Sequence, residues 1–221
     1  MFLGEKHFEG CAGLVLTDEI KLTIAAQACL LLLHRDMDYY PGLQSILVYP
    51  STYFANTTRH REAGVLEETR HSRLGEAWHS GAVVLAWDAV RNGAANPEDG
   101  HNVVLHEFAH QLDFEDGSAD GAPLLGGDGP FWKRPAKYIT WAKVLSEEFK
   151  QLQATVEFQK HSILDAYGAT NAAEFFAVAT EFFFEKPHAL QQKHPELYAE
   201  LKSFYKQDPV HWSAPAPRPH D

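Results

Sequence analysis

A pair of histidines four residues apart, set in an apolar segment, restricts the fold of this chain more than any other feature of its sequence. Residues 106–110 read His-Glu-Phe-Ala-His, and the apolar residues of 102–114 recur at helical spacing around them. This spacing predicts a buried helix over 102–114. Positions i and i+4 lie on one face of a helix, so His106 and His110 point the same way. Because unpartnered buried imidazoles are costly, the fold has to provide something that both can bind.

A zinc ion would satisfy both imidazoles at once. Zinc is held tetrahedrally by histidine, cysteine and carboxylate groups, and two histidines on one helix face can reach the same ion. Glu107 follows the first histidine directly and is placed to accept a proton from a water that the metal activates. The pattern therefore predicts a hydrolytic zinc site with His106 and His110 as ligands and Glu107 as general base. A helix with two ordinary histidines and a surface glutamate is the alternative, and the apolar flanks argue against it.

The third zinc ligand has two candidates in the sequence. Asp116, six residues beyond the second histidine, stands where some zinc sites take their third ligand after a helix break at glycine. Asp113 occupies the position of that glycine here, which makes the sharp turn harder to form. The other candidate is Glu174, on a separate helix predicted over 171–185, as in zinc enzymes with two histidines and a glutamate. A capping box at the start of that helix is the alternative interpretation of Glu174.

Two further acids could hold a ligand histidine in orientation. Asp113 could cap its helix or accept a hydrogen bond from a ligand histidine. Glu181 lies seven residues after Glu174 and shares a face of the same apolar helix. For Glu181 the alternative is a solvated stripe together with Glu185.

Size and composition limit the classes of function. The 221 residues, 45% of them hydrophobic, favour a single domain over 1–210, and a proline-rich tail over 211–221 is expected to be disordered. A net charge of −11 argues against a direct nucleic-acid partner. No apolar run reaches the ~20 residues that cross a bilayer, and residues 1–10 do not resemble a signal peptide. We therefore expect no membrane association and a cytoplasmic protein, with Cys11 and Cys29 as small buried side chains rather than a disulfide framework.

Hydrophobic periodicity and turn residues predict the remaining elements. The expected helices are 17–34, 102–114, 137–160, 171–185 and 195–206, and the expected strands are 45–50 and 81–87. The expected loops are 55–72, which could instead be a broken hairpin, 91–100 and 115–136. The last of these is rich in glycine and proline and could line a substrate site.

Several segments taken together resemble the Mlc titration factor A family. They are residues 8–11, 26–33, 75–78, 81–87, 102–113, 165–178 and 204–209. The resemblance runs from about residue 6 to residue 209, and so many matches in order are more specific than the pentapeptide alone. The family is described as zinc metallopeptidases whose core is similar to the catalytic domain of anthrax lethal factor.

Carried over by position, the resemblance implies a complete active site. It makes His106, His110 and Glu174 the zinc ligands and Glu107 the general base. It makes Tyr167 the active-site tyrosine, whose hydroxyl could donate a hydrogen bond to the developing oxyanion. The implied fold class is α+β: a mainly helical, zincin-like domain of the gluzincin type with a small mixed sheet.

The resemblance also implies that the edge strand of this sheet lines the active-site cleft. That strand contains Gly81, Val83 and Val84, which would bind an extended peptide as an added strand. An ordinary core strand is the alternative. One position departs from the lethal-factor pattern, because Val178 stands where a second acid is expected, and Glu181 is the candidate to replace it.

Three functions follow from these residues and from the resemblance. The first is a zinc-dependent peptidase, an aminopeptidase included, that acts on a peptide or protein. The resemblance implies the alternative, a regulatory protein that sequesters a transcriptional repressor of sugar uptake, and an acidic surface would suit the basic DNA-binding domain of such a repressor. A purely structural zinc protein is the third, and Glu107 argues against it because structural sites close the fourth position with a protein ligand.

Overall fold

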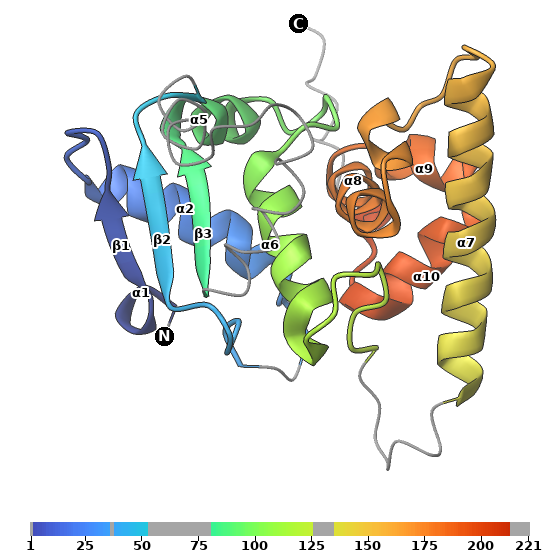
Figure 1. The fold of residues 1–221 in the computed structure, drawn as a ribbon, viewed down its shortest axis with the longest axis horizontal. Coiled ribbons are helices and arrows are strands. Elements are labelled where there is room, and N and C mark those ends of the chain that lie inside the picture. The colour runs from blue at the N-terminus through green and yellow to red at the C-terminus, as the bar shows by residue number, and fades with distance from the viewer. Residues whose placement is uncertain (1, 36–37, 53–80, 126–134, 213–221) are drawn as a thin grey trace, which may run out of the picture.

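The computed structural model describes residues 2–35, 38–52, 81–125 and 135–212 (Figure 1). The strands are β1 (His7–Gly10), β2 (Ser45–Tyr49) and β3 (Ala82–Ala86). The helices are α1 (Phe2–Glu5), α2 (Asp18–Leu30), α5 (Trp87–Ala95), α6 (Val103–Asp113), α7 (Pro135–Glu157), α8 (Ala172–Glu185), α9 (Pro187–Lys193) and α10 (Pro195–Tyr205). Short 3-10 turns are η1 (Phe114–Asp116), η3 (Ala166–Ala169) and η4 (Pro209–His211). The predicted loop at 55–72 and most of the predicted tail lie outside the described residues.

The three strands form a parallel sheet in the order β1-β2-β3. Ile46 of β2 pairs with Phe8 on one side and with Val83 on the other. Parallel neighbours need a crossover connection, and α2 provides the one between β1 and β2. The α+β class and the small sheet are confirmed. A mixed sheet was expected, whereas every strand pair in the described ranges is parallel.

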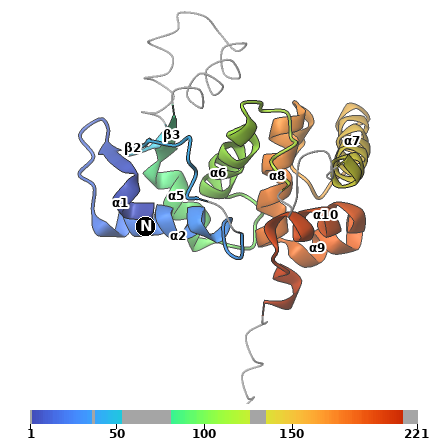
Figure 2. The ribbon, with the colours of Figure 1, turned by 90° about the horizontal axis from the view of Figure 1, so that it is seen from below.

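Helix α6 stands between the sheet and the C-terminal helices (Figures 1 and 2). It packs against β3, α2 and α5 on one side and against α8 on the other. One cluster of buried hydrophobic side chains connects both sides, from Ile46 in the sheet through Phe108 of α6 to Phe176 and Leu201. The helix that carries both histidines is therefore in the middle of the core, as its apolar sequence requires.

The ends of α6 follow from its sequence. Asn102 is the N-cap, and its side-chain oxygen accepts hydrogen bonds from the backbone N–H groups of Val104 and Leu105, both at 3.1 Å. The helix runs through η1 and stops at Gly117, which has a φ of +91°. The predicted helix over 102–114 is confirmed within a residue at each end.

The predicted loop over 91–100 is wrong in its first half, because α5 continues to Ala95. Val90 of this helix is fully buried in the core. Gly93 faces Asn102, and a Cβ atom at that glycine would lie 3.3 Å from the asparagine Cα. The glycine that suggests a loop instead allows two helix ends to approach closely. Strand β1 and helices α1 and α9 were not predicted.

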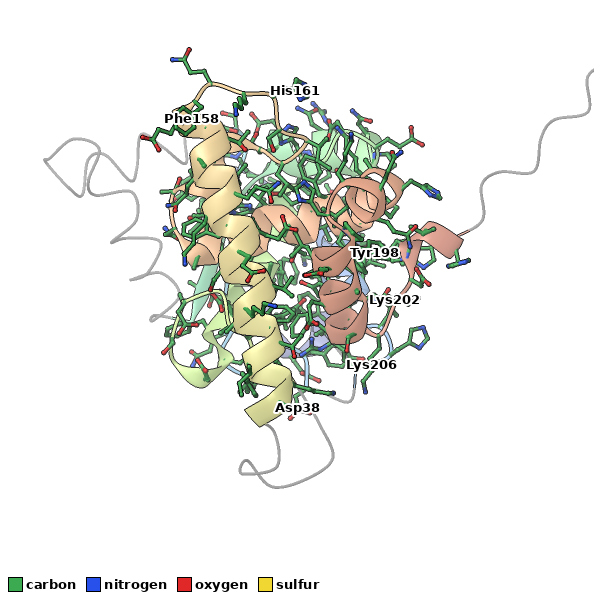
Figure 3. The ribbon with its side chains drawn as sticks, turned by 90° about the vertical axis from the view of Figure 1, so that its right-hand side faces the viewer. Asp38, Phe158, His161, Tyr198, Lys202 and Lys206 are labelled. Atoms are coloured by element: carbon green, nitrogen blue, oxygen red, sulfur yellow. The ribbon has the colours of Figure 1, made fainter. Side chains whose placement is uncertain are left out.

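Helix α7 covers the outer face of the helical half (Figure 3). Figure 3 shows α7 along its length, with Phe158 and His161 at one end and Lys202 of α10 beside it. Trp141 of α7 is buried, and its indole N–H donates to the carbonyl of Gly121 at 2.9 Å. The helix begins at residue 135 and ends at 157, against a predicted range of 137–160.

Two expectations from composition have mixed outcomes. No helix of the described residues is long and apolar enough to cross a bilayer. Cys11 and Cys29 are free thiols, as expected, but both are half-buried rather than fully buried.

Candidate metal centre

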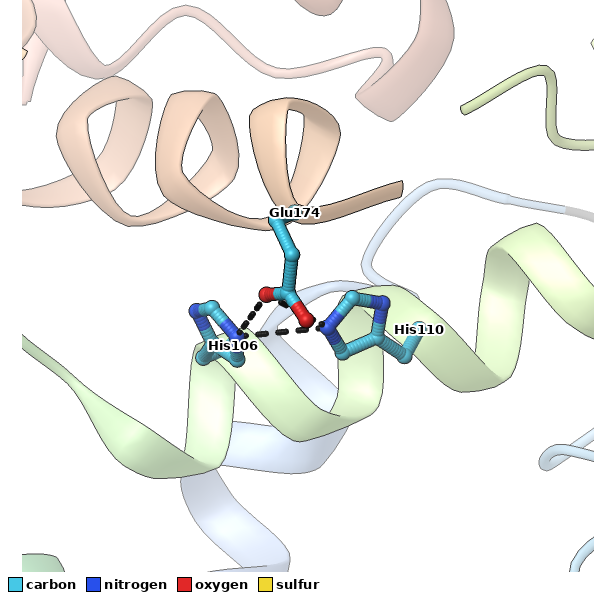
Figure 4. Close-up of side chains that lie close together, drawn as sticks. All are labelled: His106, His110 and Glu174. Carbon is cyan, nitrogen blue, oxygen red and sulfur yellow. Dashed lines mark hydrogen bonds and ion pairs between the residues drawn. The ribbon is translucent and has the colours of Figure 1, made fainter. Parts of the chain in front are cut away.

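Three donor atoms from two helices converge beside α6 (Figure 4). The Nε2 atoms of His106 and His110 lie 3.2 Å apart. Oε2 of Glu174 lies 3.0 Å from Nε2 of His106 and 3.3 Å from Nε2 of His110. Figure 4 shows the Glu174 carboxylate extending from α8 toward the two rings.

The separations of these atoms fit a tetrahedral metal ion. Ligand atoms bound to zinc at ~2.1 Å with tetrahedral angles lie about 3.4 Å from one another. The three observed separations, 3.0, 3.2 and 3.3 Å, are close to that value. Two imidazoles and one carboxylate also leave the fourth position to water or substrate, which is typical of catalytic rather than structural zinc sites. The residues present therefore fit a zinc ion.

Glu174 enters the site from the first turn of α8. Asn171 caps this helix by accepting the backbone N–H of Glu174 at 2.9 Å. A full capping box would also return the Glu174 side chain to its N-cap, but here that side chain points to the histidines. The backbone N–H of Glu174 is therefore part of the helix cap, while its side chain belongs to the metal group. Its position near a helix cap and its role as a candidate ligand do not exclude each other.

Carboxylates make this pocket favourable for a positive charge. Burial disfavours a charged His106, but hydrogen bonds with Glu174 and Glu181 outweigh this and raise the pKa of His106 to about 10. Burial likewise opposes ionisation of Glu174, yet its hydrogen bonds with His106 and His110 hold the pKa of that carboxyl well below its usual range. A divalent cation would replace the proton that the metal-free site retains.

Glu181 holds the ring of His106 from its other side. Its Oε1 atom lies 2.8 Å from Nδ1 of His106, and its Oε2 atom accepts the backbone N–H of Asn102. With Nδ1–H directed to a carboxylate, the Nε2 lone pair of His106 is directed to the metal position. Glu181 is buried, with 6% of its surface exposed, and so the alternative of a solvated stripe is wrong.

A second buried carboxylate, Glu185, holds the chain just before α6. It accepts the backbone N–H of Gly100 and the side-chain amide of Asn102, both at 3.0 Å. The same amide donates to Oε1 of Gln27 in α2 at 2.7 Å. Burial raises the pKa of Glu185 to about 7, although the hydrogen bonds from Asn102 and Gly100 act to lower it. Because Asn102 also bonds Glu181, α8 fixes the residue that starts the histidine helix.

The metal group opens on a cleft of about 560 Å³. The cleft lies beside α5 and the chain that leads into α6. Among the residues that line it are Asp99, His101, His106, Glu107, Tyr167 and Glu181. Glu107 is half-buried and next to the metal group, where a general base is required.

Tyr167 reaches the same cleft from η3. Its hydroxyl donates to Oε1 of Glu174 at 3.3 Å, and its ring centroid lies 6.0 Å from that of His106. Asp165 caps η3 by accepting the backbone N–H of Tyr167 at 2.7 Å. The side chain is 37% exposed, which leaves its hydroxyl within reach of a substrate.

The other candidates lie elsewhere. Asp113 is fully buried, and its Oδ2 atom accepts the backbone N–H of Gly121 at 2.9 Å. Burial raises the pKa of Asp113 to about 7. Asp116 is exposed, accepts the backbone N–H of Ser118 and is outside the group that could share one metal ion. The strand residues are not among those that line the cleft.

Sequence reasoning missed several residues of the site. Asn102 and Glu185 form buried hydrogen bonds to the start of α6, and His101 lines the cleft. Asn102 alone had a sequence signal, as an N-cap residue directly before an apolar helical segment.

Comparison with known proteins places these residues in a family context. The sequence model of a family described as glucose-regulated metallo-peptidase M90 matches residues 1–206. An uncharacterized protein of Synechocystis sp. is 43% identical over 211 residues, which is 95% of this chain and 74% of that protein.

Two proteins called Mlc titration factor A are also similar to this chain. The one from Klebsiella pneumoniae is 30% identical over 213 residues, 95% of this chain and 76% of the relative. The one from Serratia proteamaculans is 32% identical over 212 residues, 94% of this chain and 77% of the relative.

Proposed function

The chain belongs to the glucose-regulated metallopeptidase M90 family, and from this premise we propose that it is a zinc-dependent peptidase of the gluzincin type. The observation that carries the proposal is the convergence of His106, His110 and Glu174, whose donor atoms all lie within 4.8 Å of one another. A carboxylate general base, Glu107, lines the cleft beside them. A helix with two histidines that faces a helix with the glutamate also supports a zincin-like fold.

Each residue has a separate part in hydrolysis. Zinc, when bound, polarises the scissile carbonyl and lowers the pKa of the water that it coordinates. Glu107 accepts the proton of the attacking water and passes it to the leaving amine. The Tyr167 hydroxyl donates a hydrogen bond to the oxygen that becomes negative. Glu181 keeps the His106 ring in the tautomer that presents Nε2.

The edge of β3 is the proposed binding site for an extended peptide. The Gly81 carbonyl accepts the backbone N–H groups of Gln44 and Ser45, at 2.8 and 3.1 Å. Backbone groups alternate in direction along a strand, so Gly81 and Val83 face β2 whereas Val84 faces the other edge. Of the three candidate residues, Val84 would bond the peptide and the other two would hold the strand in place.

The test of the peptidase proposal is Glu107→Gln. We expect this variant to retain zinc and to lose hydrolysis of a peptide mixture followed by mass spectrometry, because the amide cannot accept the proton. Glu147→Gln, at an exposed position of α7, is the matched control and should be fully active. The same assay separates endopeptidase from aminopeptidase action by the products. Hydrolysis at the wild-type rate by Glu107→Gln would refute the mechanism.

A second function rests on the name of the relatives. Two proteins called Mlc titration factor A, described above, share 30% and 32% identity with this chain. Binding of a transcriptional repressor in the cytoplasm is therefore the alternative. If it is separate from catalysis, a His106→Ala variant should still capture a purified repressor in a pull-down. Failure of the wild-type protein to bind would exclude this function for that repressor.

A further inference from the structure

One carboxylate, Asp165, faces two residues of the metal cleft. Its Oδ1 atom accepts the backbone N–H of Tyr167 at 2.7 Å and so fixes the turn that carries the tyrosine. Its Oδ2 atom lies 3.9 Å from Nδ1 of His101. Tyr167 and His101 both line the cleft next to Glu107. A single acid thus connects a proposed oxyanion donor with a histidine that has no role so far.

The backbone of His101 is held firmly on both sides. Its own N–H donates to Asp99 at 2.8 Å, and the N–H of Gly100 donates to the buried Glu185 at 3.0 Å. The following residue, Asn102, is bonded to Glu181 and is the N-cap of α6. A side chain on so rigid a base has a defined direction, which reduces the entropy lost when it binds a reacting group.

The ring of His101, in contrast, contributes little to the fold. Its side chain is 61% exposed, and Asp165 is the acid that the described part of the structure places within ion-pair distance of it. At 3.9 Å the two groups are close enough for attraction but too far apart for a hydrogen bond. Hydrogen bonds in catalytic sites are often long without substrate and shorten when it binds.

The chemistry of the cleft gives this ring a task. Attack on a peptide carbonyl creates a negative oxygen, which hydrogen-bond donors around it stabilise. With Nδ1 directed to Asp165, the opposite nitrogen, Nε2, is turned away from the acid. The acids that line the same cleft, Asp99, Glu107 and Glu181, are hydrogen-bond acceptors as carboxylates, so a donor has to come from another side chain. An Nε2–H group of His101 would be such a donor.

We propose that His101 donates a hydrogen bond from Nε2 to the carbonyl oxygen of the substrate as that oxygen becomes negative, and that Asp165 is its positioning residue. This inference rests on the proposed peptidase function. It gives the cleft a donor besides Tyr167, from a different element of the chain. No proton is transferred by His101 in this role, since Glu107 carries the proton to the leaving amine.

The test compares two probes on the zinc-loaded protein. A phosphinic tripeptide has a tetrahedral phosphorus, whose oxygens resemble those of the tetrahedral intermediate. Acetohydroxamate, in contrast, is a small planar metal chelator. We expect His101→Ala to lower the affinity for the phosphinic tripeptide about tenfold, as calorimetry measures it. The zinc content and the affinity for acetohydroxamate should be unchanged. In peptide hydrolysis kcat should fall at least tenfold with KM within twofold. Equal affinity of both proteins for the phosphinic tripeptide would overturn the inference.

Asp165→Asn separates positioning from capping. Asparagine is as good an N-cap as aspartate, so the turn at Tyr167 is retained while the charge that faces His101 is lost. We expect a smaller fall in kcat than for His101→Ala, and no further fall when Asp165→Asn is added to His101→Ala. Additive losses would show that Asp165 does not act through His101.

The control is His161→Ala, which changes an exposed histidine near the end of α7 that does not line the cleft (Figure 3). It should match the wild type in every measurement. A wild-type protein that neither hydrolyses peptides nor binds the phosphinic tripeptide would refute the peptidase function, and with it this inference. A wild-type protein that does both, with His101→Ala equal to it, would refute the role of His101 alone.

Discussion

At the scale of single residues, the metal group depends on the direction of one imidazole ring. Glu181 contacts both Nδ1 of His106 and the backbone N–H of Asn102. The ring therefore cannot turn without losing its hydrogen bond to Glu181, a buried acid that the Asn102 backbone also holds in place. Such partners of metal ligands typically change metal affinity by 10–100-fold, although they do not touch the metal.

Glu181→Gln should therefore weaken zinc binding by about 10–100-fold, because an amide holds the imidazole N–H less strongly than a carboxylate. Competition with a chromogenic chelator measures this affinity. Glu148→Gln is a matched control, because Glu148 accepts a hydrogen bond from Nδ1 of His194 at 2.6 Å, away from the metal group. Equal zinc affinity of the two variants would contradict the proposed role of Glu181.

The sequence predicts some of these residues and not others, for a physical reason. His106, Glu107 and His110 follow from helix periodicity, since all three lie within five residues of one helix. Glu174 lies 64 residues beyond His110, so only the packing of α8 on α6 brings them together. Spacing places Glu181 on the same face as Glu174, but the rotation of α8 decides whether that face is buried or solvated.

At the scale of elements, the start of α6 links the metal group to the rest of the core. Asn102 caps α6 through its side-chain oxygen, and its side-chain amide donates to Glu185 and Gln27. Its backbone carbonyl accepts the N–H of His106 at 2.9 Å. The first histidine therefore lies one turn from a residue that two other helices hold.

Asn102→Ala should destabilise the protein by about 2–3 kcal/mol, because it removes a cap and takes a hydrogen-bond partner from the buried Glu185 and the half-buried Gln27. Urea unfolding measures the loss. Zinc affinity should fall as well, because the turn that contains His106 loosens. Thr17→Ala removes the N-cap of α2 and should cost about 1 kcal/mol without a change in zinc affinity. If both variants lose zinc affinity equally, the start of α6 has no special role.

The elements that sequence reasoning missed are those without a clear periodic pattern. Strand β1 has four residues, too few for alternation to be recognised. Helix α5 contains Asn92 and Gly93, which favour loops, and packing of Val90 overrides that preference. The parallel arrangement of the sheet depends on the path of the crossover, which hydrophobic patterns do not encode.

At the scale of the whole molecule, buried acids make stability depend on pH. Burial raises the pKa values of Asp113, Glu115 and Glu185 to about 7, which is above their values in an unfolded chain. Between about pH 4.5 and 7 the folded protein thus binds more protons than the unfolded one, and its stability falls as pH rises. His106 acts in the same direction at higher pH, since its raised pKa stabilises the fold fully below about 6.5 and that contribution is lost toward pH 10.

The metal-free protein should therefore be more stable at pH 5.5 than at pH 8.5, as thermal unfolding in the presence of a chelator would measure. Glu115→Gln should reduce this difference, because both oxygens of Glu115 are buried without a hydrogen-bond partner and ionisation costs free energy there. The gain at pH 8.5 is about 1 kcal/mol once its partial exposure is allowed for. Glu147→Gln, at an exposed site, should leave the pH profile unchanged. If the metal-free protein instead became more stable from pH 5.5 to 8.5, the cost of ionising these three buried acids would not be the dominant effect of pH on its stability.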